Sequence, residues 1–131
     1  MKLTVLGGCG AWPMVEQACS GYLLEQGPFR LLIDPGYAVL PALLKVCRAT
    51  DVNAVLVSHG HPDHCADLNP LLRALVLGDQ PRSVLQVFAP KGALDRILTL
   101  DQVRSVAKAA DVNRLDDGSS LRLGPFTVES T

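Results

Sequence analysis

Four side chains of the kinds that bind divalent metals lie within six residues of one another. They are His59, His61, Asp63 and His64, and they include every histidine of the chain. Imidazole nitrogen and carboxylate oxygen are ligands that zinc and related metals take. The alternative is a polar surface loop that happens to be rich in histidine, but so dense a cluster after an apolar strand favours a metal site. A catalytic metal usually has three protein ligands, and no histidine follows His64 to complete the set.

The spacing of these residues allows two metals to be bound. His59 and His61 are two positions apart, so in an extended segment their side chains lie on the same side and can hold one metal. Pro62 then redirects the chain, and Asp63 and His64 can hold a second. Two metals about 3.5–4 Å apart can share a bridging hydroxide and stabilise both ends of an in-line displacement. The loop therefore predicts hydrolytic chemistry.

The metal loop is expected at the carboxyl end of a buried strand. Residues 54–57 form a short continuous apolar run, which is typical of a buried strand that exposes the following loop at a sheet edge. Further strands are predicted over 2–6, 20–25, 29–34, 84–89, 121–123 and 126–129. Helices are predicted over about 37–49, 70–77, 90–100 and 101–109. This order predicts a mixed α/β (α+β) fold with a single sheet and flanking helices.

The composition limits the classes to which the chain can belong. A chain of 131 residues with 48% hydrophobic and 19% charged residues is expected to form one globular domain. The net charge of −1 and the scattered Lys and Arg side chains indicate no clear nucleic-acid patch and no attraction to an anionic membrane. No signal peptide and no apolar run of about 18 residues is recognisable. Four cysteines without Cys-x-x-Cys spacing are expected as reduced thiols in a cytoplasmic protein.

Several residues outside the cluster have a structural as well as a functional interpretation. The run Gly7–Gly10 is expected as a tight turn, because it lacks the Gly-Lys-Ser/Thr of a P-loop. Trp12 and Tyr22 are expected to be packing residues. Three cysteines are expected to pack as well, whereas Cys65 follows His64 directly and is the exception. Asp34 either orients a metal-bound histidine or is a turn carboxylate at a strand end, and both interpretations stay open.

The cluster resembles a known family signature. Residues 59–64 match the His-x-His-x-Asp-His motif of the metallo-β-lactamase superfamily. Residues 5–10, 18–24 and 31–36 resemble the leading strands and the Asp-x-Gly turn of its ribonuclease Z-like phosphodiesterase branch. Residues 121–128 resemble the hairpin that comes before the third histidine ligand of that family. The motif is highly specific for the superfamily, and the flanking segments extend the resemblance over nearly the whole chain.

The resemblance implies a fold and a ligand set. The fold would be an αββα sandwich, and residues 1–131 would be a single, truncated domain that forms its N-terminal half. His59 and His61 would hold the first metal, and Asp63 and His64 the second. Both metals would be zinc, with manganese or iron as alternatives, and the remaining ligands would lie beyond Thr131. Asp67 would support a ligand, whereas the residue pattern alone allows it to cap a helix that begins near residues 68–70.

A metal-dependent hydrolase is the function that these observations favour. A metal-activated hydroxide would attack a small-molecule or nucleotide phosphodiester, and Asp63 would be the catalytic residue that orients it. One alternative is a catalytically silent fragment that binds metal weakly and serves in association. Another is a thioester or lactam hydrolase of the same fold.

Half of such a sandwich would leave an apolar sheet face in water. We expect this face to contain Val5, Leu23, Leu31, Ile33, Val55 and Val57. Monomeric proteins rarely expose contiguous apolar patches of more than a few hundred Å². The chain is therefore expected to form a homodimer or higher oligomer around a two-fold axis.

Overall fold

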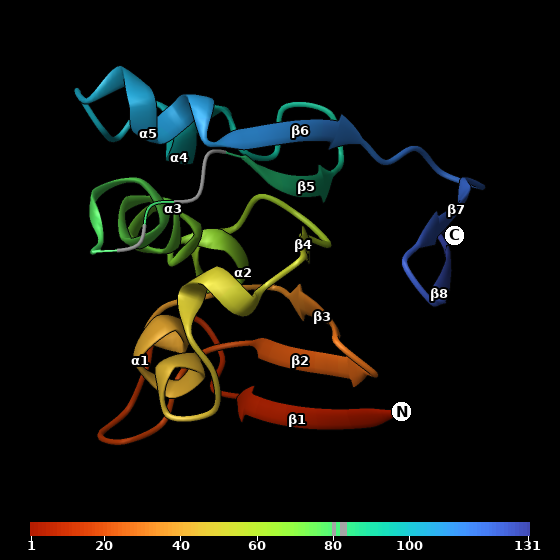
Figure 1. The fold of residues 1–131 in the computed structure, drawn as a ribbon, viewed down its shortest axis with the longest axis horizontal. Helices are drawn as coiled ribbons and strands as arrows, with labels where there is room; N and C mark the ends of the chain where they lie inside the picture. The colour runs from red at the N-terminus through yellow and green to blue at the C-terminus, as the bar shows by residue number, and fades with distance from the viewer. Residues whose placement is uncertain (80, 82–83) are drawn as a thin grey trace.

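A six-stranded mixed sheet forms the centre of the structure (Figure 1), a computed structural model that describes residues 1–79, 81 and 84–131. The strands lie side by side in sequence order: β1 (Lys2–Gly7), β2 (Gly21–Gln26), β3 (Phe29–Ile33), β4 (Ala54–Leu56), β5 (Leu85–Ala89) and β6 (Ala110–Arg114). The first three strands are antiparallel, and β3 to β6 run parallel. The carboxyl ends of β3, β4 and β5 therefore meet at one edge of the sheet, which is where sites in parallel sheets usually lie.

Short helices connect the parallel strands from β3 to β6. They are α1 (Val39–Leu44), the 3₁₀ turn η1 (Ala49–Asp51), α2 (Pro62–Cys65), α3 (Leu68–Leu77), α4 (Asp95–Leu98) and α5 (Arg104–Lys108). A hairpin of β7 (Ser120–Leu123) and β8 (Phe126–Glu129) forms a separate two-stranded sheet. Within the described residues, none of the helices has the length and apolar character that crossing a membrane requires.

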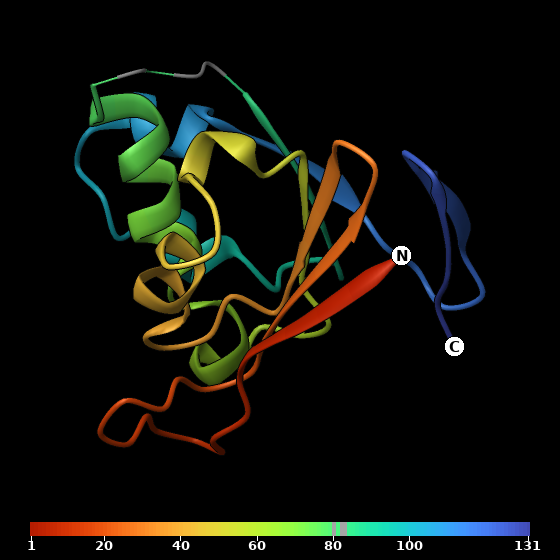
Figure 2. The same ribbon diagram turned by 60° about the horizontal axis from the view of Figure 1, so that its bottom comes forward.

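The six-stranded sheet separates two apolar layers. Figure 2 shows the helices on one side of the sheet and the β7–β8 hairpin on the other. The larger core lies on the helix side and contains buried side chains from the sheet and from α3, such as Leu72 and Leu75. The smaller core lies under the hairpin, where Phe126 packs edge-on against Phe29 with ring centroids 6.0 Å apart. The expected mixed α/β fold with flanking helices is confirmed.

The residues predicted to form one exposed apolar face are divided between these two layers. Leu23, Val55 and Val57 are fully buried in the helix-side core, whereas Leu31 is buried under the hairpin. Of the six predicted residues only Val5 belongs to the exposed group, with 63% of its surface accessible. The prediction was wrong because successive residues of a strand point to opposite faces, and because the hairpin covers part of the second face.

Two further elements differ from the sequence-based expectation. The β7–β8 hairpin forms its own sheet, so the prediction of a single sheet was wrong. Strand β6 was not predicted, because Asp111 and Asn113 are uncommon in strands. Both side chains bond to Gln86 on the neighbouring strand β5, through distances of 2.8 Å and 2.9 Å. This cross-strand network stabilises an edge strand that intrinsic propensity disfavours.

Three of the predicted helices are shorter in the structure for local reasons, whereas the helix predicted over 70–77 is present as α3 and begins two residues earlier. The predicted helix 37–49 ends at Leu44, and the Asp51 carboxylate accepts the backbone N–H of Arg48 to begin a separate turn. The predicted helix 90–100 begins only at Asp95, because Gly92 has a φ of 76°. The predicted helix 101–109 begins at Arg104, after the Asp101 side chain accepts the N–H of Val103.

Candidate metal centre

The metal loop begins directly after β4 and continues into α2. His61 is the N-cap of α2 and has extended backbone angles, and Pro62 occupies the first helical position. Proline is favoured there because its fixed φ suits a helix start and its missing N–H is not needed. Asp63 and His64 consequently lie in the first turn of the helix, while His59 and His61 lie on the extended segment before it.

The four predicted ligands converge, as expected from the motif. The imidazole centroid of His59 is 4.8 Å from that of His61 and 4.0 Å from that of His64. The Asp63 Oδ2 atom is 3.4 Å from His64 Nε2. Three imidazoles and one carboxylate thus meet at the carboxyl end of β4.

Asp34 supports the loop from the end of the neighbouring strand β3. Its carboxylate is buried, with 6% exposed surface, and accepts hydrogen bonds from the backbone N–H and the hydroxyl of Ser58, both at 2.7 Å. It also lies 2.9 Å from His64 Nδ1. Asp34 has a φ of 50°, in the left-handed region that aspartate tolerates better than most residues. This direct contact with His64, a candidate ligand, favours the interpretation that Asp34 orients a histidine over the interpretation that it is only a turn carboxylate.

This network assigns the protons on two imidazoles. Because the Asp34 carboxylate only accepts hydrogen bonds, His64 carries its proton on Nδ1 and donates it there. The Ser58 hydroxyl donates to Asp34, so the His59 Nδ1–H donates to Ser58 Oγ at 3.0 Å. With Nδ1 as the donor, Nε2 is the atom that each ring can offer to a metal, which is the arrangement that metal-binding histidines show, and His64 Nε2 lies 3.4 Å from Asp63 Oδ2. Ser58 was given no role from the sequence, although a hydroxyl residue between a buried strand and a ligand loop is a recognisable signal.

Two glycines let backbone segments pack against the loop. A Cβ atom on Gly36 would lie 1.8 Å from the carbonyl oxygen of Asp63, so no larger residue fits there. A Cβ atom on Gly60 would lie 2.6 Å from the carbonyl oxygen of Ala93, in the segment after β5. The loop is therefore held between the turn after β3 and the segment after β5.

The Asp67 side chain bonds to the start of α1 and not to the start of α3, the helix that the residue pattern allowed it to cap. It is the N-cap residue of α3, but its side chain makes no capping bond there. Its carboxylate instead accepts the backbone N–H of Leu40 at 2.8 Å, near the start of α1. Burial raises the pKa of Asp67, while bonds from the N–H groups of residues 38–40 act to lower it. The prediction that the Asp67 side chain caps a helix beginning near residues 68–70 is thus wrong. Asp67 instead joins the start of α1 to the end of the metal loop.

Cys65 is a neutral packing residue in this structure. It is fully buried, and its thiol lies 3.3 Å from the carbonyl oxygen of His61, to which it donates. Burial raises the pKa of the thiol to about 11, and the nearby charges of Asp34 and Asp63 add to the shift. In this structure the thiol thus bonds to the His61 carbonyl and packs in the core, as expected of the other three cysteines.

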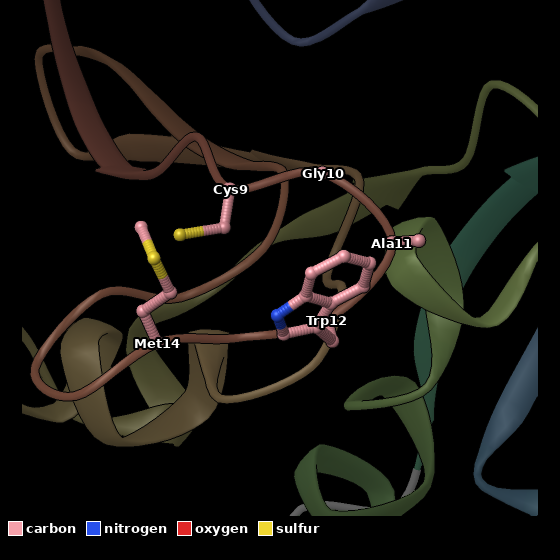
Figure 3. A pocket seen from close by; sticks show the side chains of 5 residues that line it. All are labelled: Cys9, Gly10, Ala11, Trp12 and Met14. Carbon is pink, nitrogen blue, oxygen red and sulfur yellow. The ribbon is translucent and has the colours of Figure 1, made fainter.

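The expectation that Trp12 packs in the core is wrong. The loop between β1 and β2 projects from the molecule, and 71% of the Trp12 side chain is exposed. Figure 3 shows its ring together with the Cys9 and Met14 side chains around a pocket of 130 Å³. Tyr22, by contrast, is half-buried on β2.

The candidate ligands in the described part of the chain do not by themselves make up a complete metal site. Within residues 1–79, 81 and 84–131, no group of three or more His, Cys, Asp or Glu side chains is arranged to hold a metal ion. The tautomers and the proximity of the four residues nevertheless match the donor chemistry of a divalent metal. The residues therefore fit a site in which each metal would receive at most two ligands from the described residues.

The family model of the β-lactamase superfamily domain matches residues 29–131 of the chain. The chain belongs to the metallo-β-lactamase superfamily. It is 45% identical to the probable metallo-hydrolase YhfI of Bacillus subtilis, over 98% of this chain and 52% of that protein. It is 31% identical to ribonuclease Z of Salinispora arenicola, over 98% of this chain and 43% of that protein.

A solved structure gives the same result. The crystal structure of the metallo-β-lactamase fold protein YhfI from Bacillus subtilis superposes with a TM-score of 0.80 and 32% identity, over 95% of this chain and 49% of that chain. The chain thus spans about half the length of the curated relatives that it matches.

Proposed function

We propose that this chain supplies part of the ligand set of a two-metal hydrolase that cleaves phosphodiesters. The observation that carries the proposal is the Asp34 network, which holds His59 and His64 by their Nδ1 atoms and so leaves Nε2 of each ring as the atom that would bind a metal. A polar surface loop would not need a buried carboxylate to hold two imidazoles in this form. One relative is named a probable metallo-hydrolase, which supports metal-dependent hydrolysis, and another is named a ribonuclease Z, which supports a phosphodiester as the bond that is cleaved.

His59 and His61 would hold one metal, and Asp63 and His64 the other. Zinc suits this nitrogen and oxygen donor set best, and manganese or iron also suit it. A bound metal would supply an activated water near neutral pH and stabilise negative charge on the phosphate. The remaining ligand positions would be filled by water, by a second copy or by residues outside this sequence.

The residues of the chain itself would have distinct tasks. Asp34 would hold His64 directly and His59 through Ser58 in a fixed orientation, and Asp63 would accept a hydrogen bond from the attacking water. The buried strand β4 and the contacts at Gly36 and Gly60 would keep the loop rigid. Such preorganisation lowers the reorganisation required during the reaction.

The test is hydrolysis of bis(p-nitrophenyl) phosphate by the polypeptide that carries residues 1–131 in the cell, loaded with zinc. His61→Ala should lower the rate at least about a hundredfold, because it removes a metal ligand. The His61 side chain is exposed, so the substitution should change stability by less than about 0.5 kcal/mol. Replacing the exposed Glu129 with Ala is the matched control and should leave the rate unchanged. Full activity in the His61 variant would exclude this residue from the site.

A second candidate function is a silent fragment that binds metal weakly and serves in association. The incomplete ligand set within the described residues favours it. Bound zinc without any hydrolysis of phosphodiester, thioester or lactam substrates would support this candidate over the enzyme.

A further inference from the structure

A cleft of 370 Å³ lies directly beside the candidate metal centre. One wall is formed by Gly60, His61 and Pro62, and the other by the segment from Gly92 to Ile97 that follows β5. This volume is within the range of pockets that bind small ligands, and it exceeds the 130 Å³ of the pocket next to Trp12.

The fold fixes the position of this cleft. Strands β4 and β5 are adjacent and parallel, so the loops that follow them leave the sheet at the same edge. The backbone contact between Gly60 and Ala93 then holds the two walls together at the base of the cleft. A ligand in the cleft would therefore lie next to His61.

The cleft carries one cationic side chain. The exposed Arg96 lines it. Four other arginines pair with carboxylates, namely Arg30 with Glu25, Arg48 with Asp51, Arg73 with Asp101 and Arg114 with Asp116. Within the described residues, no ion pair occupies the Arg96 guanidinium. The neighbouring Asp95 also lines the cleft, so an anion there would meet one charge of each sign.

We propose that this cleft binds a second phosphate group of a nucleotide substrate, adjacent to the phosphodiester that is cleaved, and that Arg96 is the residue that binds it. The inference rests on the proposed function, because it takes the scissile phosphodiester to lie at the metal loop. The planar guanidinium forms paired hydrogen bonds with phosphate oxygens that no other side chain reproduces. Asp95 can accept a hydrogen bond from a hydroxyl or amino group of the same nucleotide.

The experiment measures binding without turnover. The probe is a dinucleotide with a phosphorothioate linkage and a terminal 5′-phosphate, compared with the same molecule without that phosphate, by calorimetry on the zinc-loaded chain. In the unmodified chain, removal of the terminal phosphate should weaken binding about tenfold, as expected for one charge-assisted pair. In Arg96→Gln the two probes should bind equally well.

Two control variants sharpen the result. Arg104→Gln removes an exposed arginine that does not line this cleft, and it should keep the tenfold difference. Asp95→Asn removes the negative charge beside Arg96, and binding of the phosphorylated probe should not weaken. A tenfold difference that persists in Arg96→Gln, or that is absent in the unmodified chain, would overturn the proposal. Failure of the proposed function would instead be seen as hydrolysis that survives His61→Ala.

Discussion

At the scale of single residues, the candidate site depends on a buried carboxylate that is not itself one of the four predicted ligands. Asp34 contacts Ser58 and His64 directly, and it reaches His59 through the Ser58 hydroxyl. Its position at the end of β3 was visible in the sequence, but its partners lie 24 and 30 residues further along the chain. Only the parallel pairing of β3 with β4 brings them together.

Asp34→Asn tests this role. Asparagine also tolerates a φ of 50° and has a similar size, so the backbone should be retained. Its amide cannot accept hydrogen bonds from Ser58 and His64 as a carboxylate does, and zinc affinity should fall about 10- to 100-fold. Competition with a chromophoric chelator measures this change. Asp117→Asn, at an exposed position, is the control. Unchanged affinity in the Asp34 variant would show that the imidazoles need no such support.

A second prediction at this scale concerns the Cys65 thiol. Because burial raises its pKa to about 11, its thiolate fraction at pH 8 is on the order of one part in a thousand. Iodoacetamide should therefore modify the partly exposed Cys9 well before Cys65 in the folded chain. Peptide mapping by mass spectrometry follows both sites. Equal rates at the two cysteines would mean that the α2 segment opens readily.

At the scale of elements, close backbone contacts decide how the loop is held. Gly36 in the turn after β3 lies against the carbonyl of Asp63 in α2, where no Cβ atom fits. Gly36→Ala should therefore lower the free energy of unfolding by about 1–3 kcal/mol, the usual cost of overpacking. Gly10→Ala is a matched control, because nothing lies within 4 Å of its Cβ position. Denaturant midpoints compare the two, and a Gly36 variant as stable as the control would contradict the packing described here.

The sequence predicted the elements that have regular apolar patterns better than those that depend on distant partners. The β2–β3 hairpin and the strand before the metal loop were recognised because Leu31 and Val55 belong to continuous apolar runs. Strand β6 depends on hydrogen bonds to Gln86, and Asp67 bonds to the start of α1. Neither contact has a local signal. In the site, the convergence of the four predicted ligands followed from their spacing, whereas the place of Arg96 beside them required the adjacency of β4 and β5.

At the scale of the whole molecule, the sheet face opposite the helices is only partly covered. The hairpin buries Leu31 and Ala54, but Leu3 and Val5 on the edge strand β1 remain 60% and 63% exposed. The register places these two next to Leu24 and Tyr22 on the same face. We expect a second copy of the chain to cover this apolar stripe in a two-fold dimer.

Val5→Lys should convert such a dimer into a monomer, because the charge would be buried at the interface. Leu100→Lys is the control, since Leu100 is similarly exposed at 64% but lies between α4 and α5. Light scattering at several concentrations gives the mass of each variant. An unmodified chain that stays monomeric at high concentration would rule out the dimer.

The central claim is that the loop from His59 to His64 binds divalent metal with an incomplete set of protein ligands. Equilibrium dialysis of the purified chain against zinc, followed by elemental analysis, tests it most directly. We predict up to two equivalents of zinc per chain, both removed by dialysis against a mild chelator, because two protein ligands hold a metal less tightly than the four of structural sites. A chain that binds no more zinc than a variant with His59, His61 and His64 all replaced by Ala, or that keeps one equivalent against the chelator, would contradict the claim.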